Sequence, residues 1–170
     1  FVFLFLVLRR RLQSLWQQLC WLQAHPEHCH GGNHWLENLT ALAIGGLHFD
    51  APMSTRMHRR AMCLLQRELR QQVLSDGGHQ ERSASYHLLM LDRLAELANA
   101  VQATTGDQPP WLMEAIESMA HWAELIRLET GEAPRFNDSA ADTAPPLDEV
   151  LAFARVGLLQ RSQPAQSPRP

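Results

Sequence analysis

The sequence predicts an all-α protein, and two observations support this prediction. Apolar residues recur every three or four positions through most of the 170 residues, which is the period of a helix with one buried face. No stretch shows the strict alternation of apolar and polar residues that marks a half-buried strand. The fold class we expect is therefore helix packed on helix.

Short turns marked by glycine or proline divide the chain into six helical spans. We expect these spans at about residues 4–24, 33–49, 54–74, 83–101, 111–129 and 147–156. Pro26 and Pro52 lie just beyond the first two spans, and Pro110 suits the first turn of the fifth.

The helices alternate between two kinds. Residues 33–49 and 83–101 are apolar on most sides, which predicts enclosed helices, whereas residues 54–74 and 111–129 are amphipathic and should face water. This alternation favours a barrel or layered array of antiparallel helix pairs. We expect it to occupy residues 1–157, before a disordered tail rich in Pro, Gln and Ser at residues 158–170.

Composition restricts the class of protein. Hydrophobic residues make up 45% and charged residues 19%, which is typical of a globular domain with a core. The net charge of -3 gives no general attraction to nucleic acid or to anionic membranes. Cys20, Cys29 and Cys63 are odd in number and widely spaced, so no disulfide framework is expected.

The first residues have an unusual order. Phe1–Leu8 are all apolar and Arg9–Arg11 follow, whereas a secretory signal places its positive charges before the apolar run. Eight residues are also too few to span a bilayer. We therefore expect the sequence to begin inside a longer gene product or in a misread frame, so no signal peptide can be identified.

Polar residues cluster at the start of the most apolar helix. Asn33 and Glu37 are four residues apart and share a face, as do His34 and Asn38. A helix N-terminus presents free N–H groups to an anionic ligand. Capping by Asn33 is the alternative interpretation, although it does not explain His34 and Asn38 on so apolar a helix.

A second polar cluster precedes and enters the other enclosed helix. It consists of His79, Glu81, Arg82, Tyr86 and His87, and Tyr86 is the chain's one tyrosine. A tyrosine at the start of a buried helix often packs its ring and bonds its hydroxyl nearby. That structural interpretation stays open beside a catalytic one.

The stretch from His25 to His34 resembles a metal site in residue type alone. Glu27, His28, Cys29 and His30 lie between these two histidines, and His and Cys are zinc ligands. The spacing is crowded and no second ligand pair recurs, so a polar turn between helices is the favoured interpretation and no metal is expected.

Three motifs stand out in the sequence: Gly32-Asn33-His34-Trp35-Leu36-Glu37-Asn38, the stretch Asp76-Gly77-Gly78-His79-Gln80-Glu81-Arg82-Ser83-Ala84-Ser85-Tyr86-His87, and Phe136-Asn137-Asp138-Ser139. Together they resemble the heparinase II/III family, which includes heparin-sulfate lyases and related alginate lyases. The resemblance covers about residues 15–157, and the order and spacing of the first two motifs are its most specific features.

The resemblance implies a fold and a reaction. Members combine an (α/α) toroid with a β-sandwich domain, so this chain would be a partial toroid of antiparallel helix pairs without the sandwich. They cleave uronic-acid polysaccharides by β-elimination. That reaction requires neutralisation of the uronate carboxylate, a base for the C5 proton and an acid for the departing O4.

Three residues take catalytic roles by resemblance. Asn33 would hydrogen-bond the uronate carboxylate and help bind the enolate-like intermediate. His34 would assist there or in proton abstraction. Tyr86 would protonate the leaving oxygen and, in some members, also act as the base.

Further residues are expected to bind substrate. Arg82 and His87 would orient Tyr86 or bind sugar, and Glu37 shares the face of Asn33. The resemblance implies an anionic polysaccharide partner, no cofactor, and a periplasmic or secreted location. Because a further catalytic histidine and the sandwich domain come later in the family, we expect this chain alone to be inactive.

Two other functions remain alternatives. A helical binding or interaction module without catalysis can use the same scaffold. A glycoside hydrolase is the second alternative, because toroids also host hydrolases, which need two opposed carboxylates. Glu37, Glu81 and Asp138 are candidates, but no pairing among them stands out.

Overall fold

The computed structural model describes residues 2–27, 31–140 and 142–161 and confirms the all-α class. No strand occurs in these residues, apart from an isolated bridge between Val73 and His79. The helices are α1 (Val2–Ala24), α2 (Gly32–Leu47), α3 (Pro52–Gln72), α4 (Ala84–Thr105), α5 (Pro110–Leu125) and α6 (Leu147–Arg161). The chain divides into two compact units, residues 1–65 and 66–170.

The first unit is organised around α2. Trp35, Leu36, Leu39, Leu42 and Ala43 are buried, as the apolar character of this helix predicts. Two glycines near its end allow close packing of neighbouring helices, and both stand where a side chain would collide with another residue. A Cβ at residue 45 would lie 2.4 Å from the Leu19 side chain of α1, and one at residue 46 would lie 2.8 Å from the backbone of α3.

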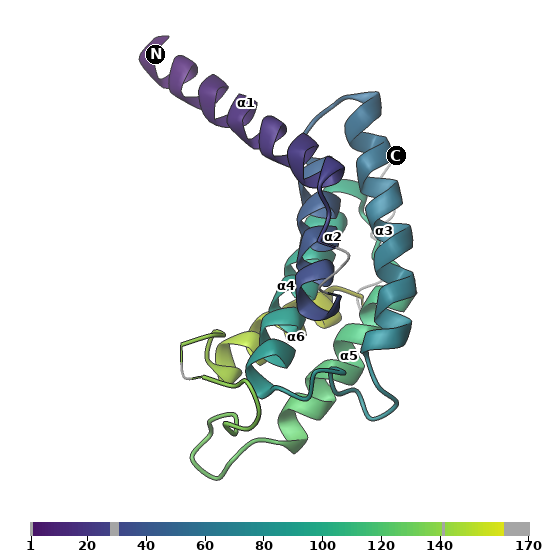
Figure 1. Ribbon diagram of the computed structural model, residues 1–170, viewed down its shortest axis with the longest axis vertical. Helices are drawn as coiled ribbons and strands as arrows, with labels where there is room; N and C mark the ends of the chain where they lie inside the picture. The colour runs from purple at the N-terminus through teal and green to yellow at the C-terminus, as the bar shows by residue number, and fades with distance from the viewer. Residues whose placement is uncertain (1, 28–30, 141, 162–170) are drawn as a thin grey trace, which may run out of the picture. The chain divides into compact units, whose positions relative to one another are not determined.

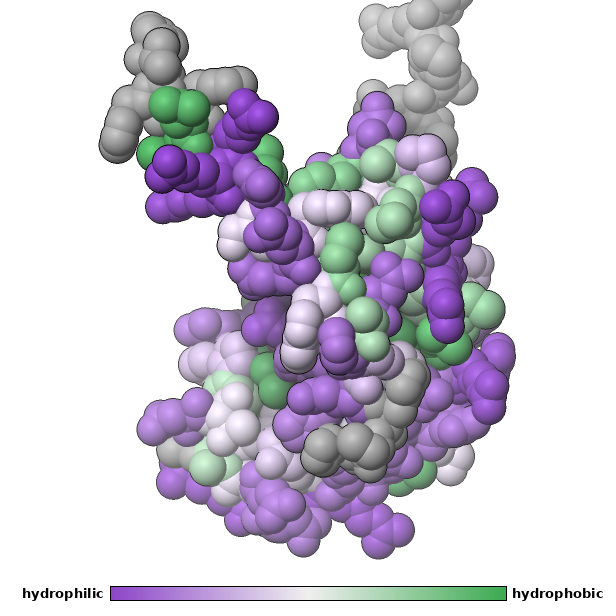
Figure 2. Space-filling view, turned by 45° about the horizontal axis from the view of Figure 1, so that its top comes forward, coloured by the Kyte–Doolittle hydropathy of each residue, from purple (hydrophilic) through white to green (hydrophobic). Residues whose placement is uncertain are grey.

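The outer surfaces of α1 and α3 differ. On α3 a buried stripe alternates with exposed arginines, which confirms the predicted amphipathic helix. On α1, at the upper left of Figure 2, apolar residues lie beside strongly polar ones on the exposed surface. These apolar residues include Leu6, Leu8, Leu12 and Leu15, which are 38–52% exposed.

The second unit is built on α4, α5 and α6, which contact one another pairwise. The short turn after α4 makes α5 antiparallel to it (Figure 1). The core between the three helices is formed by large apolar side chains with at most 1% exposure: Met90, Leu91, Leu94, Leu97, Leu112, Met113, Ile116, Met119 and Leu151. The all-α unit of paired helices is consistent with a toroid-type fragment.

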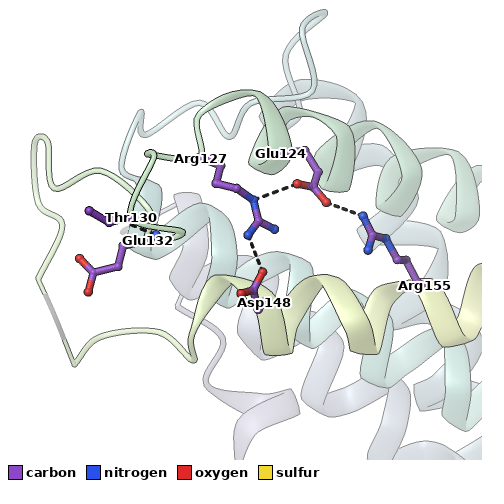
Figure 3. A network of polar contacts seen from close by, with 6 residues as sticks. All are labelled: Glu124, Arg127, Thr130, Glu132, Asp148 and Arg155. Atoms are coloured by element: carbon purple, nitrogen blue, oxygen red, sulfur yellow. Dashed lines mark hydrogen bonds and ion pairs between the residues drawn. The ribbon is translucent and has the colours of Figure 1, made fainter.

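A polar network links the end of α5 to α6 (Figure 3). Arg127 donates from Nε to Glu124 at 3.1 Å and from Nη1 to Asp148 at 2.5 Å, and Arg155 also pairs with Glu124. Between the helices, the Glu132 amide donates to the Thr130 hydroxyl at 3.5 Å.

Several helix boundaries differ from the sequence prediction. Gly31 is the N-cap of α2, so the interpretation of Asn33 as its cap is wrong. α5 ends at Leu125 rather than near residue 129. Arg127, just after the helix, contacts Asp148 of α6. α6 continues to Arg161 instead of ending at residue 156. Residues 162–170 of the predicted tail lie outside the described residues.

No helix in the part of the chain that the structure describes combines the length and apolar character needed to cross a membrane.

Candidate active site

The start of α2 is shaped by two glycines with positive φ. Gly31 has φ 60° and ψ -154°, and Gly32 has φ 51°, a backbone that glycine adopts most readily. Gly31 offers no side-chain cap to the helix. The N-cap position therefore supplies none of the side-chain oxygens that Ser, Thr, Asn or Asp would place there.

The candidate residues on α2 differ in exposure. Asn33 is buried, with 9% exposure. The His34 side chain is 63% exposed, and Glu37 is partly exposed. Burial in the first turn restricts the Asn33 side chain more than the exposed side chain of His34.

Asn38 joins the start of α2 to the preceding loop. Its Oδ1 accepts from the Glu27 amide at 3.2 Å, and its Nδ2 donates to the His34 carbonyl at 2.9 Å and to the Glu27 carboxylate at 3.5 Å. The same carboxylate lies 3.7 Å from Nδ1 of His34. Glu27, which sequence reasoning placed only in a polar turn, therefore contacts the catalytic candidate His34.

The second candidate set begins with a tight turn before α4. The Leu74 amide donates to the Gly78 carbonyl at 2.8 Å, and Asp76 Oδ1 accepts from the Gly78 amide at 2.9 Å. Gly77 has φ 89°, and a Cβ there would lie 2.3 Å from the carbonyl oxygen of Ser118 on α5. The paired glycines thus allow the turn to pack directly against the α5 backbone.

His79 leaves this turn as a buried residue with 1% exposure. Its Nε2 lies 3.2 Å from Oε1 of Gln72, and its Nδ1 lies 3.4 Å from the Glu81 amide. The amide can only donate, so Nδ1 accepts and Nε2 carries the proton. Burial lowers the pKa of His79, against an opposing effect of Glu81.

His87 is enclosed between α4 and α5. It has no exposed surface, its Nε2 donates to the Met119 carbonyl at 2.9 Å, and its ring centroid lies 4.4 Å from that of Trp122. Among the described residues, its Nδ1 is buried without a hydrogen-bond partner. An imidazolium would need a second acceptor there, and burial lowers the pKa of His87 to about 4.

Tyr86 occupies the first turn of α4 and is partly exposed. Ser83 is the N-cap of the helix, and its hydroxyl accepts from the Tyr86 amide at 3.3 Å. Arg82, which is exposed, precedes this cap with a left-handed backbone at φ 53°. Arg82 and Tyr86 are therefore accessible, whereas His87 is held in the core.

The third motif lies against this helix start. Ser139 Oγ is 3.0 Å from Ser83 Oγ and accepts from the Ser85 amide at 3.3 Å. Ser85 Oγ donates to the Ala140 carbonyl at 3.1 Å, and Asn137 Nδ2 donates to the Arg82 carbonyl. The second and third motifs, more than fifty residues apart in sequence, are thus brought together.

A groove of about 600 Å³ lies beside this contact. Ser85 and Leu88 of α4 form one side, and residues 130–135 and 144–148 form much of the rest. Its side chains include Arg135 as well as Glu132 and Asp142, so the charges in this groove do not favour an anionic ligand.

The candidate residues therefore fall into two sets. Asn33, His34 and Glu37 belong to the first unit, and Arg82, Tyr86 and His87 belong to the second. Sequence reasoning missed the contact partners that hold each set, chiefly Glu27, Met119, Trp122 and Ser139. Ser139 was part of a recognised motif, but the motif gave no indication of what it touches.

The described residues contain no group of three or more His, Cys, Asp or Glu side chains able to hold a metal ion. His28, Cys29 and His30 of the crowded turn lie outside the described residues.

Comparison with known protein families identifies the family of the chain. Residues 5–154 match the family described as heparinase II/III N-terminus. Because the match spans most of the chain, the protein belongs to this family and is related to polysaccharide lyases. Searches of curated proteins and of solved structures found no significant match.

Proposed function

We propose that the protein is a polysaccharide lyase that cleaves anionic, uronic-acid-containing polysaccharides by β-elimination. The family match over residues 5–154 is the observation that carries this proposal. The positions of Asn33 and Tyr86 support it, because each lies in the first turn of a long helix. The proposal includes action in the periplasm or outside the cell, and a β-sandwich domain elsewhere in the same protein.

The start of α2 suits the uronate carboxylate. The N-terminal N–H groups of a helix and its dipole favour an anion, and the N-cap residue Gly31 adds no side chain at that end. In our proposal the Asn33 amide donates to the carboxylate and disperses the charge that develops when C5 loses its proton. Glu37, four residues later on the same face, contacts a sugar hydroxyl.

The elimination consists of four changes in bonding, which together balance. A base takes the C5 proton, the C5–H electron pair forms the C4–C5 double bond, the C4–O4 bond breaks, and the leaving O4 receives a proton. Tyr86 supplies that proton. The base is His34 or Tyr86, since either side chain is accessible enough to reach a substrate.

Arg82 and His87 have separate roles in this proposal. Arg82 is exposed and always charged, so it binds a carboxylate or sulfate of the polysaccharide. His87 has no exposed surface and bonds Met119, so it orients the start of α4 and does not touch sugar.

The test uses protein from the complete reading frame that contains this sequence. It is incubated with a panel of uronate polysaccharides, and the unsaturated uronate product is followed by its near-ultraviolet absorbance. We expect Tyr86→Phe to lower kcat by about a hundredfold or more, since a general acid contributes at least that factor. Thr143→Ala, an exposed change in the loop before α6, is the control.

Other products would contradict the proposal. New reducing ends without the unsaturated product would indicate a hydrolase that uses a carboxylate pair. Retention of a polysaccharide without any cleavage would indicate a binding module. Equal activity of Tyr86→Phe and wild type would remove Tyr86 from the catalytic residues.

A further inference from the structure

We propose that the 136–140 loop (Phe136–Ala140) is a positioning device for Tyr86. This inference rests on the proposed lyase function, because it assigns the loop a role in the step that Tyr86 performs. The loop contacts the start of α4 and the residue before its cap through three hydrogen bonds. Asn137 donates to the Arg82 carbonyl, whereas Ser139 and Ala140 accept from Ser85. None of these residues needs to contact the substrate in order to act.

The loop supplies what the start of a helix lacks. The first amide groups of α4 have no carbonyl partner within the helix. The Ser83 hydroxyl satisfies the Tyr86 amide, and the Ser139 hydroxyl satisfies the Ser85 amide. These two hydroxyls also bond each other at 3.0 Å. Loss of the Ser139 hydroxyl would therefore leave the Ser85 amide unpaired and release one restraint on the cap of Tyr86.

The backbone at the contact carries strain that the loop helps to maintain. Arg82 and Asn137 both have left-handed φ values, 53° and 50°. Asparagine adopts this region comparatively readily, whereas arginine does not. The Asn137 side chain donates to the carbonyl of the strained residue Arg82. Such conformations persist where surrounding contacts determine them, and this one sets the direction in which the chain enters α4.

Both neighbours of Tyr86 are consequently fixed. Ser85 is held through its amide and its hydroxyl by the 136–140 loop, and His87 is held through Nε2 by the Met119 carbonyl. Tyr86 itself keeps its accessible position between them. A proton donor works only when its geometry matches the leaving oxygen, and a displacement of about 1 Å can lower a rate about a hundredfold.

The experiment compares Ser139→Ala with Ser139→Thr, which keeps the hydroxyl, and with Thr143→Ala, which removes an exposed hydroxyl further along the same connection. Each is made in protein from the complete reading frame. Steady-state kinetics gives kcat and KM separately, and hydrogen exchange is followed at the Ser85 and Tyr86 amides. Wild type is assayed alongside.

We expect Ser139→Ala to lower kcat about tenfold to a hundredfold with little change in KM, because Tyr86 acts in the transition state. Exchange at the two amides should accelerate about fivefold to tenfold, the effect of one lost hydrogen bond. Ser139→Thr should restore both values, and Thr143→Ala should behave as wild type. Restoration by threonine separates a positioning role from a general loss of stability.

Two results would overturn the inference. Unchanged exchange in Ser139→Ala would show that the loop does not fix the start of α4. Faster exchange with unchanged kcat would show that this fixation has no role in the reaction. Inactive wild type would count against the lyase proposal instead, and the exchange rates would still decide whether the loop holds the helix.

Discussion

The starts of α2 and α4 carry similar polar motifs but are held in different ways. The start of α2 has a glycine cap without a side chain, and His34 has a 63% exposed side chain beside Glu27 in the preceding loop. The start of α4 is capped by Ser83, which bonds Ser139, and His87 behind it has no exposed surface. The start of α2 is held by residues close to it in the sequence, whereas the start of α4 is held by residues far from it in the sequence.

This difference teaches that the two sites should respond unequally to mutation. At α4 both neighbours of the catalytic candidate, Ser85 and His87, are buried, so function and stability are coupled there. At α2 the exposed candidate can change without loss of buried contacts. Paired substitutions of the same residue type at the two starts test this directly.

The largest difference is expected between His87→Ala and His34→Ala. Removal of the His87 ring leaves a cavity beside Trp122 and removes the hydrogen bond to the Met119 carbonyl. We expect the free energy of unfolding to fall by roughly 4 kcal/mol, as for other large buried rings. His34→Ala should change it by less than about 0.5 kcal/mol. Urea denaturation of both variants measures the two values.

His87→Gln serves as the control for the hydrogen bond. A glutamine amide can still donate to the Met119 carbonyl while the aromatic contact is lost, so its effect should fall between those of wild type and His87→Ala. Equal destabilisation by His34→Ala and His87→Ala would contradict the distinction between a local and a tertiary site.

A second pair of substitutions compares the glycines that enter the helices. Both Gly31 and Gly77 have positive φ, but a Cβ at residue 31 meets nothing within 4 Å, whereas one at residue 77 meets Ser118 at 2.3 Å. We expect Gly31→Ala to cost about 1 kcal/mol from backbone strain alone. Gly77→Ala should cost roughly 3 kcal/mol, because it adds a collision with the α5 backbone.

Thermal unfolding monitored by circular dichroism gives both values. Gly106→Ala is a useful control, since Gly106 also has positive φ and open space around it. Its backbone lies in the left-handed helical region, at φ 74° and ψ 7°, so Gly106→Ala should cost about 1 kcal/mol. If Gly77→Ala cost no more than Gly106→Ala, the turn before α4 would not be packed as closely as the structure shows.

The sequence predicted the helices well because their signals are local. Apolar periodicity placed α3 and α4 within a few residues of their observed ends. Boundaries failed where tertiary contacts or glycine geometry decide them. Asn33 has the chemistry of an N-cap, yet the positive φ of Gly31 starts the helix two residues earlier. α5 stops early, at Leu125, and Arg127 just beyond it pairs with Asp148 of α6.

The candidate site was predictable in its residues but not in its contacts. The motifs identified Tyr86, His87 and Ser139 as candidates without their surroundings. His87 bonds Met119, which lies 32 residues later in the sequence. Ser139 accepts from the Ser85 amide, 54 residues earlier in the sequence. No local pattern encodes pairings at such distances, because they arise only when the helices pack.

The smallest expected effect concerns pH and again separates the buried histidine from exposed ones. Burial lowers the pKa of His87 to about 4, from 6.5 in an exposed environment. The unfolded chain therefore binds a proton below pH 6.5 that the folded protein does not bind until about pH 4. Stability from this group is complete above pH 6.5 and declines as the pH falls toward 4.

Between pH 6 and pH 5 this linkage should lower the unfolding free energy by about 1 kcal/mol. His79, whose pKa burial also lowers, acts in the same direction and remains in the variant. The measurement is urea denaturation of wild type and His87→Gln at both pH values. The difference between their pH slopes isolates His87, because every other titrating group is shared. Parallel slopes would mean that the His87 ring becomes protonated in the folded protein as readily as in the unfolded chain, and that the α4 start is as open as that of α2.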